Sequence, residues 1–246
     1  MKESILEVKN LHFAYDEHHT VLDGISLSVF AGERIAILGS NGAGKSTFFL
    51  NLNGVLTPAE GEISYRGTKI TRKTLKKLRQ HIGIVFQDAD NQIIASSVLA
   101  EVSFGPMNLK LPRSEVEERV NTALNYMNIS QFKDRPPHYL SGGEKKRVSI
   151  ADIIAMKSEI IIFDEPTNGL DIITSKTVTD FLVDLKNQGK TIILSTHIFS
   201  LVEKLCDRVG IIFDGKMALD GPLKEMTKEK CLEDVFFDLY QGGKHE

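Results

Sequence analysis

The sequence is poor in the residues that hold metal-binding or disulfide-stapled domains together. It has only two cysteines in 246 residues, Cys206 and Cys231, which lie far apart and without the spacing of metal ligands. A zinc site or a disulfide framework is therefore not expected, and reduced thiols fit the cytoplasm. The net charge is only -3, so nothing in the charge balance favours a nucleic-acid partner.

Long apolar runs are also absent. None approaches the roughly 18 residues that a membrane-spanning helix needs, and residues 1–10 lack the apolar core of a signal peptide. If the protein serves a membrane, we expect it to do so as a peripheral protein, through a partner. The basic run from Arg72 to Arg79 is interpreted as a solvated helix face rather than a phosphate-binding patch.

The pattern of apolar residues predicts an α/β protein with an inserted helical lobe. Strands are predicted at 5–15, 24–30, 34–38, 62–66, 82–86, 160–163 and 191–195, with a hairpin over 208–220 that turns at Asp214-Gly215. Helices are predicted at 45–54, from a capping box of Ser114 and Glu117, from Ser141, around 178–185, from an inward-facing Ile198, and around 232–240. Residues 88–158 form the predicted lobe, and 223–246 hold a short C-terminal helix.

A glycine-rich segment between a predicted strand and a predicted helix fits the pattern GxxxxGKS of a phosphate loop. Its glycines let backbone N–H groups surround phosphates, the helix N-terminus adds positive potential, and this context disfavours a turn with an accidental lysine. Lys45 would pair the β and γ phosphates of ATP, and the Ser46 hydroxyl would ligate Mg²⁺. The predicted nucleotide-binding residues here are Gly39, Ser40, Asn41, Gly42, Ala43, Gly44, Lys45, Ser46 and Thr47.

Two acidic residues end the apolar strand at 160–163. Adjacent carboxylates after a buried strand are costly unless they meet a cation or a polar cleft. Asp164 would hold the Mg²⁺ shell, and Glu165 would orient or deprotonate the attacking water. Taken alone, such a pair marks the start of an ordinary loop about as often.

The segment Leu140-Ser141-Gly142-Gly143-Glu144 resembles the signature sequence of ABC ATPases, and it lies in the family's order, after the phosphate loop and before Asp164. The resemblance implies a P-loop NTPase (RecA-like) core with an antiparallel β subdomain and an inserted α-helical subdomain, with 1–246 forming one ATPase domain. In that family Ser141, Gly142 and Gly143 would act on the nucleotide of the opposite subunit. The implied partner is a second ATPase subunit, either another copy or a related paralogue.

Smaller motifs of the same family match too. Gln87 resembles the glutamine that senses Mg²⁺ and water, and His197 the histidine that contacts the γ phosphate, although a lone histidine is more often structural. Tyr15 lies where the family places an aromatic ring against adenine. Asn168 to Asp171 resembles the loop that joins the two sites, with Asn168 and Ile172 as departures. The implied catalytic set is Glu165, His197 and Gln87, and the implied Mg²⁺ set is Ser46, Gln87 and Asp164.

Residues 86–92 and 101–109 resemble the ATPases of energy-coupling-factor (ECF) importers, in particular the cobalt and nickel branch. This implies an integral membrane coupling subunit, contacted through Gln87 to Asp90, with Asp88 and Asp90 facing its arginines. It also implies a substrate-binding membrane subunit and a place on the cytoplasmic face of the cell membrane. A vitamin as the cargo and a soluble, non-transport ABC ATPase stay open as alternatives. The short tail does not favour an extra C-terminal dimer contact.

Overall fold

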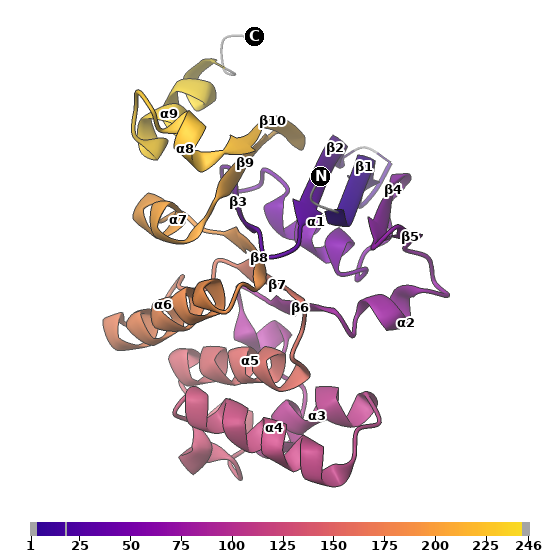
Figure 1. Cartoon of the computed structure of the whole chain (residues 1–246), viewed down its shortest axis with the longest axis vertical. Coiled ribbons are helices and arrows are strands. Elements are labelled where there is room, and N and C mark those ends of the chain that lie inside the picture. Colours follow the sequence, from indigo (N-terminus) through magenta and orange to yellow (C-terminus); the bar gives the residue numbers. More distant parts are fainter. Residues whose placement is uncertain (1–3, 18, 243–246) are drawn as a thin grey trace.

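A computed structural model describes residues 4–17 and 19–242 of the chain. Two sheets and several groups of helices make up the molecule (Figure 1). The first sheet has the order β2-β1-β4-β5, and the second the order β10-β9-β3-β8-β7-β6. The strands are β1 Ser4–Ala14, β2 Thr20–Phe30, β3 Arg34–Leu38, β4 Glu60–Tyr65, β5 Thr68–Lys69, β6 Ile82–Val85, β7 Ile160–Asp164, β8 Thr191–Ser195, β9 Arg208–Phe213 and β10 Lys216–Pro222.

The larger sheet runs through the middle of the molecule. Its strands β9, β3, β8, β7 and β6 are parallel, and only β10 is antiparallel to its neighbour. Continuous apolar runs explain this, since β6, β7 and β8 are buried at every residue, as strands covered on both faces must be. The turn at Asp214-Gly215 has positive φ at both residues, as the predicted hairpin requires.

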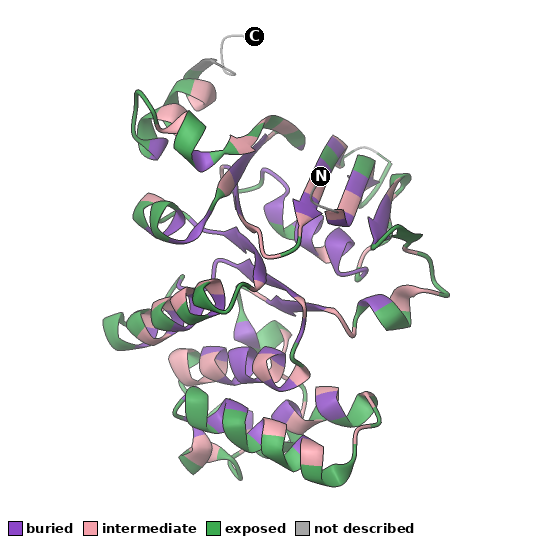
Figure 2. Cartoon of the chain, in the orientation of Figure 1, coloured by how far each residue is buried: buried purple, intermediate pink, exposed green. Residues whose placement is uncertain are grey.

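The smaller sheet is antiparallel and covers helix α1, Lys45–Leu52. Its buried side chains form one core with Phe48 and Phe49 of α1. Figure 2 shows buried stretches in the strands of this sheet and in the helix beside them. This core holds the start of α1 against β2, so the glycine-rich segment before α1 has a fixed position. The fold class expected from the sequence is therefore confirmed.

Helices fill the interval between β6 and β7 and lie together at the end of the molecule away from the smaller sheet (Figure 1). Val98, Val102, Val120 and Val148 belong to the core that these helices share with one face of the central sheet. The elements are η1 Ala89–Asn91, α3 Val98–Asn108, α4 Arg113–Tyr126, η2 Ser130–Phe132, η3 Pro137–Tyr139 and α5 Gly142–Met156.

The remaining helices are α2 Leu75–Leu78, α6 Ile172–Asn187, α7 Phe199–Leu205, α8 Leu223–Met226 and α9 Leu232–Gly242. The amphipathic last helix is confirmed, because Phe236 of α9 packs against Phe199 and Phe213 with ring centroids 5.6 and 5.4 Å apart. Residues 243–246 of the predicted C-terminal range, and 1–3 of the predicted domain, lie outside the described residues.

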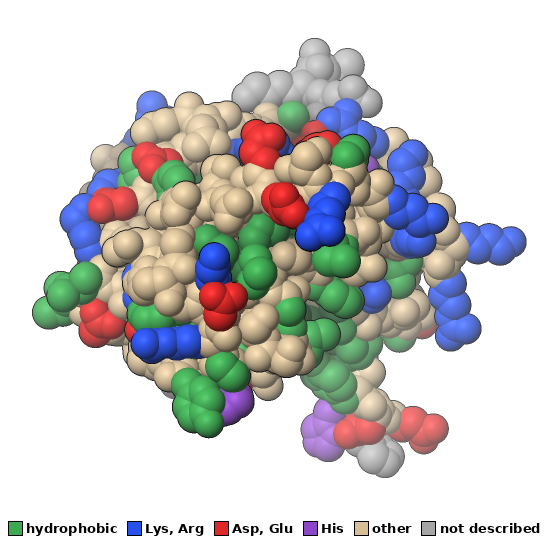
Figure 3. All heavy atoms as spheres, turned by 90° about the horizontal axis from the view of Figure 1, so that it is seen from below, with side chains coloured by type: hydrophobic (Ala, Val, Ile, Leu, Met, Phe, Trp, Pro, Cys, Tyr) green, Lys and Arg blue, Asp and Glu red, His purple; other side chains and the backbone are tan. Residues whose placement is uncertain are grey.

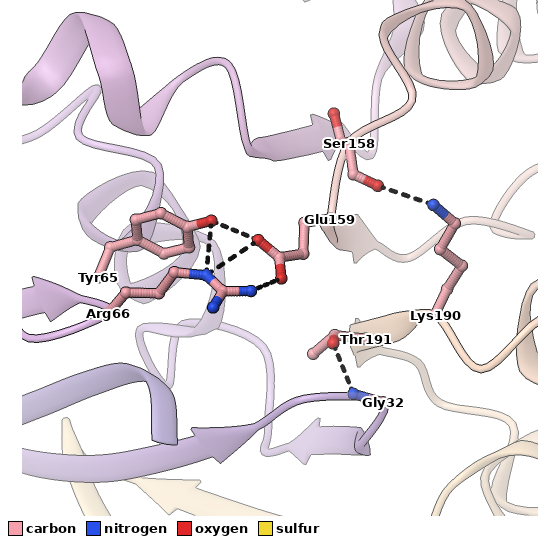
Figure 4. A network of polar contacts seen from close by, with 7 residues as sticks. All are labelled: Gly32, Tyr65, Arg66, Ser158, Glu159, Lys190 and Thr191. Carbon is pink, nitrogen blue, oxygen red and sulfur yellow. Dashed lines mark hydrogen bonds and ion pairs between the residues drawn. The ribbon is translucent and has the colours of Figure 1, made fainter. Parts of the chain in front are cut away.

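A polar network ties the smaller sheet to the start of β7 (Figure 4). The carboxylate of Glu159 accepts hydrogen bonds from the Tyr65 hydroxyl and the Arg66 guanidinium at the end of β4. Nearby, Gly32 N–H donates to Thr191 Oγ1 of β8 at 2.9 Å. These contacts fix the two sheets relative to each other.

Two local predictions were wrong. Helix α4 begins at Arg113, directly after Pro112, so Ser114 lies inside the first turn and caps nothing. Its supposed partner Glu117 accepts from Arg113 Nε at 2.9 Å instead. Ile198 is 47% exposed rather than inward, because it precedes α7 in an extended conformation and is not on the helical face.

Candidate active site

The glycine-rich loop connects β3 to α1, at the carboxyl end of the central parallel strands. Glycine is required at two positions by sterics. A Cβ at Gly39 would lie 2.4 Å from the Ile212 carbonyl oxygen. Gly44, the residue before α1, has φ 101°, and its Cβ would lie 2.9 Å from the Val21 carbonyl oxygen. The loop therefore takes a path open to few other sequences.

Lys45 is the first residue of α1, and it is only 8% exposed. Its Nζ donates to the carbonyl oxygens of Gly39 at 2.8 Å and Ser40 at 3.1 Å. Burial lowers the pKa of Lys45, and the carboxylates of Glu165 and Asp164 oppose that shift. A cation thus lies between the loop and two acids, where it can bind a phosphate.

Asp164 and Glu165 stand at the end of β7 and share one hydroxyl. Ser195 Oγ, at the end of β8, donates to Asp164 Oδ1 at 2.7 Å and accepts from Glu165 N at 3.0 Å. Glu165 has φ 45°, a left-handed conformation that is unusual for a glutamate. Such strain is held where the surroundings impose it, commonly at active sites.

The Glu165 carboxylate lies beside a histidine. His197 Nε2 is 3.0 Å from Glu165 Oε1, and the imidazole is half-exposed while the carboxylate is nearly buried. Burial raises the pKa of Glu165, and the proximity of His197 and Lys45 limits the rise. A carboxylate with a raised pKa in a polar cavity is better suited to accept a proton than an ordinary surface glutamate.

A cavity of about 490 Å³ gathers most of the predicted site residues. Four elements supply them: the glycine-rich loop with α1, the end of β6, the end of β7 and the end of β8. Ligand sites of parallel α/β sheets lie at this edge. The lining residues are Val21, Asn41, Gly42, Ala43, Gly44, Lys45, Ser46, Thr47, Gln87, Asp164, Glu165, Asn168 and His197.

The donor set in this cavity suits Mg²⁺. Ser46, Gln87 and Asp164 offer a hydroxyl, an amide and a carboxylate oxygen on the same cavity. Mg²⁺ prefers oxygen ligands and is usually held by one or two carboxylates together with substrate phosphates. Within the described residues there is no cluster of three or more His, Cys, Asp or Glu that could hold a metal by itself. The residues present therefore fit a cation bound jointly with a nucleotide.

Tyr15 lies next to the cavity, at the end of β1. Its hydroxyl is 3.2 Å from Thr47 Oγ1, and its ring meets Phe13 edge-on with centroids 5.0 Å apart. The Tyr15 ring is nevertheless 61% exposed. An exposed aromatic face at the mouth of the cavity is available for stacking on a planar base.

The signature residues are not part of this cavity. Ser141 caps α5 in a capping box with Glu144, and Gly143 packs against α6, where an added Cβ would lie 2.8 Å from Thr174 Oγ1. Thr174 in turn donates to Asp171, the residue that caps α6. Ser141, Gly142, Gly143 and Asp171 thus form a second group of predicted residues, separate from the first.

Two residues that contact the site were not predicted. Ser195 is the last residue of an apolar strand, and no motif in the sequence distinguishes it. Lys146 is 1% exposed, and it donates to the carbonyl oxygens of Phe86 at 2.6 Å and Gln87 at 2.9 Å. Helical spacing could have predicted the burial of Lys146, because Lys146 falls on the same face of α5 as the buried Ile150 and Ile153.

Asp90 has a partner within the chain. Its Oδ1 accepts from Lys145 Nζ at 2.6 Å, while Asp88 caps η1 by accepting from Asp90 N at 3.0 Å. The two acids expected to face a membrane subunit are therefore already engaged by the chain itself, although both side chains stay exposed.

Comparison with known proteins shows the family of this chain. The family model described as ABC transporter matches residues 22–168, so the chain belongs to the ABC transporter ATPases and is an ATP-binding, ATP-hydrolysing protein. The energy-coupling factor transporter ATP-binding protein EcfA of Methanocaldococcus jannaschii is 47% identical over 227 residues, which cover 92% of this chain and 81% of the relative. The chain is therefore an ATP-binding subunit of the ECF type.

Solved structures agree with this placement. The cbiO1 protein from Clostridium perfringens, described as part of the ABC transporter complex cbiONQ, is 41% identical with a TM-score of 0.80, covering 99% of this chain and 98% of that one. An ATP-binding cassette in a dimeric post-hydrolysis state with ADP and Pi is 28% identical with a TM-score of 0.79, covering 88% and 98%. No helix among residues 4–17 and 19–242 has the length and apolar character to span a bilayer.

Proposed function

We propose that this chain binds MgATP between two ATPase subunits and uses its hydrolysis to drive ECF-type uptake of a small solute, with cobalt or nickel as the cargo. The observation that carries the proposal is the division of the site. Lys45, Asp164, Glu165 and His197 share one cavity, whereas Ser141 starts a helix outside it. A second subunit that brings its own Ser141 would complete each cavity.

The predicted site residues have roles that follow from their chemistry. The loop amides and Lys45 bind the phosphates, and Ser46, Gln87 and Asp164 would hold Mg²⁺, which neutralises charge on the phosphates. Glu165 orients or deprotonates the attacking water, and His197 contacts the γ phosphate while lying against Glu165. Tyr15 stacks on the base. Positioning and electrostatics supply most of the rate in such transfers.

The helical region at 88–158 is the proposed site of contact with the membrane coupling subunit. A groove of about 640 Å³ lies between α3 and α4, lined by Leu99, Met107, Val116 and other residues. Phe104 is 57% exposed and Met107 64% exposed on α3. Figure 3 looks onto this end of the molecule and shows hydrophobic side chains between charged ones. Exposed apolar surface of this kind is typical of a protein interface.

The contact would extend along the loop from Gln87 to Asp90. An arginine of the partner that approaches this loop would compete with Lys145 for Asp90, or would meet Asp88. In this arrangement the helical region moves as a unit with the partner, and the chain is held at the cytoplasmic face of the membrane. The cargo would be chosen by a further membrane subunit, so cobalt and nickel rest on the resemblance of residues 86–92 and 101–109 to ATPases of the cobalt and nickel branch.

The test is isolation of the tagged chain from native membranes in gentle detergent, followed by mass spectrometry of the proteins that accompany it. A membrane coupling subunit, a second ATPase chain or copy, and a metal-binding membrane subunit are the expected result. A vitamin-binding subunit in place of the metal-binding one would contradict cobalt or nickel as the cargo and would still support the role as a transporter ATPase. Recovery of soluble partners alone would contradict the transport function.

A further inference from the structure

The helix that begins with the signature is attached to the loop that carries Gln87. Lys146 lies in α5, five residues or about 1.4 turns after Ser141. Its Nζ donates to the Phe86 carbonyl oxygen at 2.6 Å and to the Gln87 carbonyl oxygen at 2.9 Å. The lysine therefore binds the main chain at the residue whose side chain lines the nucleotide cavity.

Two further contacts join the same loop to the same helix. Gln92 Oε1 accepts from Phe86 N at 3.2 Å, and its Nε2 donates to the Ser149 carbonyl oxygen of α5 at 3.3 Å. At the surface, Lys145 Nζ donates to Asp90 Oδ1 at 2.6 Å. Residues 86–92 are thus fixed to α5 at three points, with Lys146 at the end nearest the cavity.

The burial of Lys146 makes its contact specific. At 1% exposure the ammonium has exchanged water for two carbonyl oxygens, an exchange that is unfavourable unless the partners are well placed. Desolvation lowers the pKa of Lys146 and the carboxylates of Asp164, Asp88 and Glu165 oppose that shift, which leaves the net pKa at about 8. A side chain without a donor, such as methionine, would leave two carbonyl groups without their partner.

We propose that Lys146 is a positioning residue for ATP hydrolysis, which holds the Gln87 main chain to the signature helix so that Gln87 enters its own cavity in register with Ser141. The inference rests on the proposed role of Gln87. It links two sites that the fold separates, because Ser141 meets the partner's nucleotide whereas Gln87 meets the chain's own. When the partner's nucleotide binds Ser141 and positions α5, the contact through Lys146 therefore also positions Gln87 in the chain's own cavity.

The experiment is a double-mutant cycle on the full chain, with kcat and KM for MgATP measured for Lys146→Met, Gln87→Ala and the two combined. We expect Lys146→Met to lower kcat about tenfold with KM within about twofold of the wild type, because the binding loop is untouched. The double variant is expected to match Gln87→Ala alone, since residues that act through one another are not additive.

Arg147→Met is the matched control. Arg147 is the adjacent cation on α5, and its Nη1 also reaches two main-chain carbonyls, those of Met127 at 3.4 Å and Asn128 at 3.3 Å, at the end of α4. Its loss removes a cation and two longer main-chain contacts from a different segment, so kcat is expected to stay within about twofold while the unfolding temperature falls. If Lys146→Met does not fold at the assay temperature, Lys146→Leu, which likewise has no donor, replaces it.

Wild-type kcat in the Lys146 variant would overturn the proposal. So would a double variant whose loss equals the product of the two single losses, because Lys146 would then act independently of Gln87. An undiminished kcat in Gln87→Ala would refute the proposed role of Gln87 itself, and Lys146 would have nothing to position. That outcome is recognised from the Gln87 variant alone, which separates it from failure of the Lys146 inference.

Discussion

His197 Nε2 lies 3.0 Å from Glu165 Oε1, and each residue follows the end of a neighbouring parallel strand. The short distance between β7 and β8 brings the two side chains together, and the left-handed backbone of Glu165 aims its carboxylate into the cavity. The contact thus joins two residues that are 32 positions apart (197 minus 165), which we propose act together in hydrolysis.

Replacing His197 with alanine is expected to lower kcat by about 100-fold, because it removes the proposed contact with the γ phosphate as charge develops there. Binding of ATP is expected to change little, since Lys45 and the loop amides remain. Steady-state kinetics give kcat, and titration with a fluorescent ATP analogue gives the Kd. A wild-type kcat would remove His197 from the reaction.

Lys45→Ala is expected to weaken nucleotide binding roughly 10- to 100-fold, the size of a charge-assisted hydrogen bond. In this structure the ammonium binds Gly39 O and Ser40 O, and it would turn to the phosphates. Equilibrium titration measures the loss. Lys190→Ala serves as the control, since its Nζ binds the Ser158 carbonyl oxygen away from the cavity, and unchanged affinity in the Lys45 variant would contradict the assignment.

Substitutions at two neighbouring glycines test packing within the chain and contact with a partner independently. A Cβ at Gly143 would lie 2.8 Å from Thr174 Oγ1, whereas at Gly142 it meets no atom within 4 Å. Gly143→Ala is therefore expected to lower the unfolding temperature by about 2–4 °C, corresponding to roughly 1 kcal/mol. Gly142→Ala is expected to leave it unchanged and to lower turnover about tenfold, because its methyl group would face the partner's nucleotide.

Calorimetry and ATPase assays on both glycine variants provide the comparison. Wild-type turnover in Gly142→Ala would show that this part of α5 does not approach a nucleotide. Equal unfolding temperatures for the two variants would instead show that Gly143 is not packed against Thr174 as the structure places it.

The contact of Glu159 with Tyr65 and Arg66 predicts a pH-dependent contribution to stability. Desolvation raises the pKa of Glu159, but hydrogen bonds from Arg66 and Tyr65 outweigh it, so the net pKa is lowered. A lowered folded-state pKa contributes stability above the unfolded value of about 4.3, and this is lost as pH falls through the folded pKa.

Glu159→Gln is thus expected to cost roughly 1 kcal/mol at pH 7, a modest value because the group is partly exposed. The difference from wild type should shrink as the pH falls below about 4. Urea unfolding at several pH values measures it, with Glu118→Gln on the exposed face of α4 as the control. A difference that is constant with pH would mean that the carboxylate charge does not contribute.

The sequence predicted the parts of the site that are local patterns. Short segments were enough to predict the glycine-rich loop, the acids at the end of β7, and Gln87 and His197 soon after β6 and β8. We expected these residues to lie together because the ends of parallel strands meet at one edge of the sheet. Asp164 and Glu165 lie where that reasoning placed them. The fold class followed from the same strand–helix alternation.

Other features depended on contacts that are distant in sequence. Lys146 sits between two cations in a basic run, which usually indicates exposure, and only the loop after β6 gives it partners. Ile198 has helical spacing but lies before α7, so its direction is set by the extended backbone. Helix α4 begins before Ser114, because the helix starts directly after Pro112.

The most direct test of the account is single-turnover hydrolysis of MgATP by Glu165→Gln beside the wild type. The account predicts that the variant binds ATP with near wild-type affinity and cleaves it at least about 100-fold more slowly, the size expected for loss of a positioned base. Cleavage at the wild-type rate would contradict the central claim, since Glu165 would then neither orient nor deprotonate the attacking water.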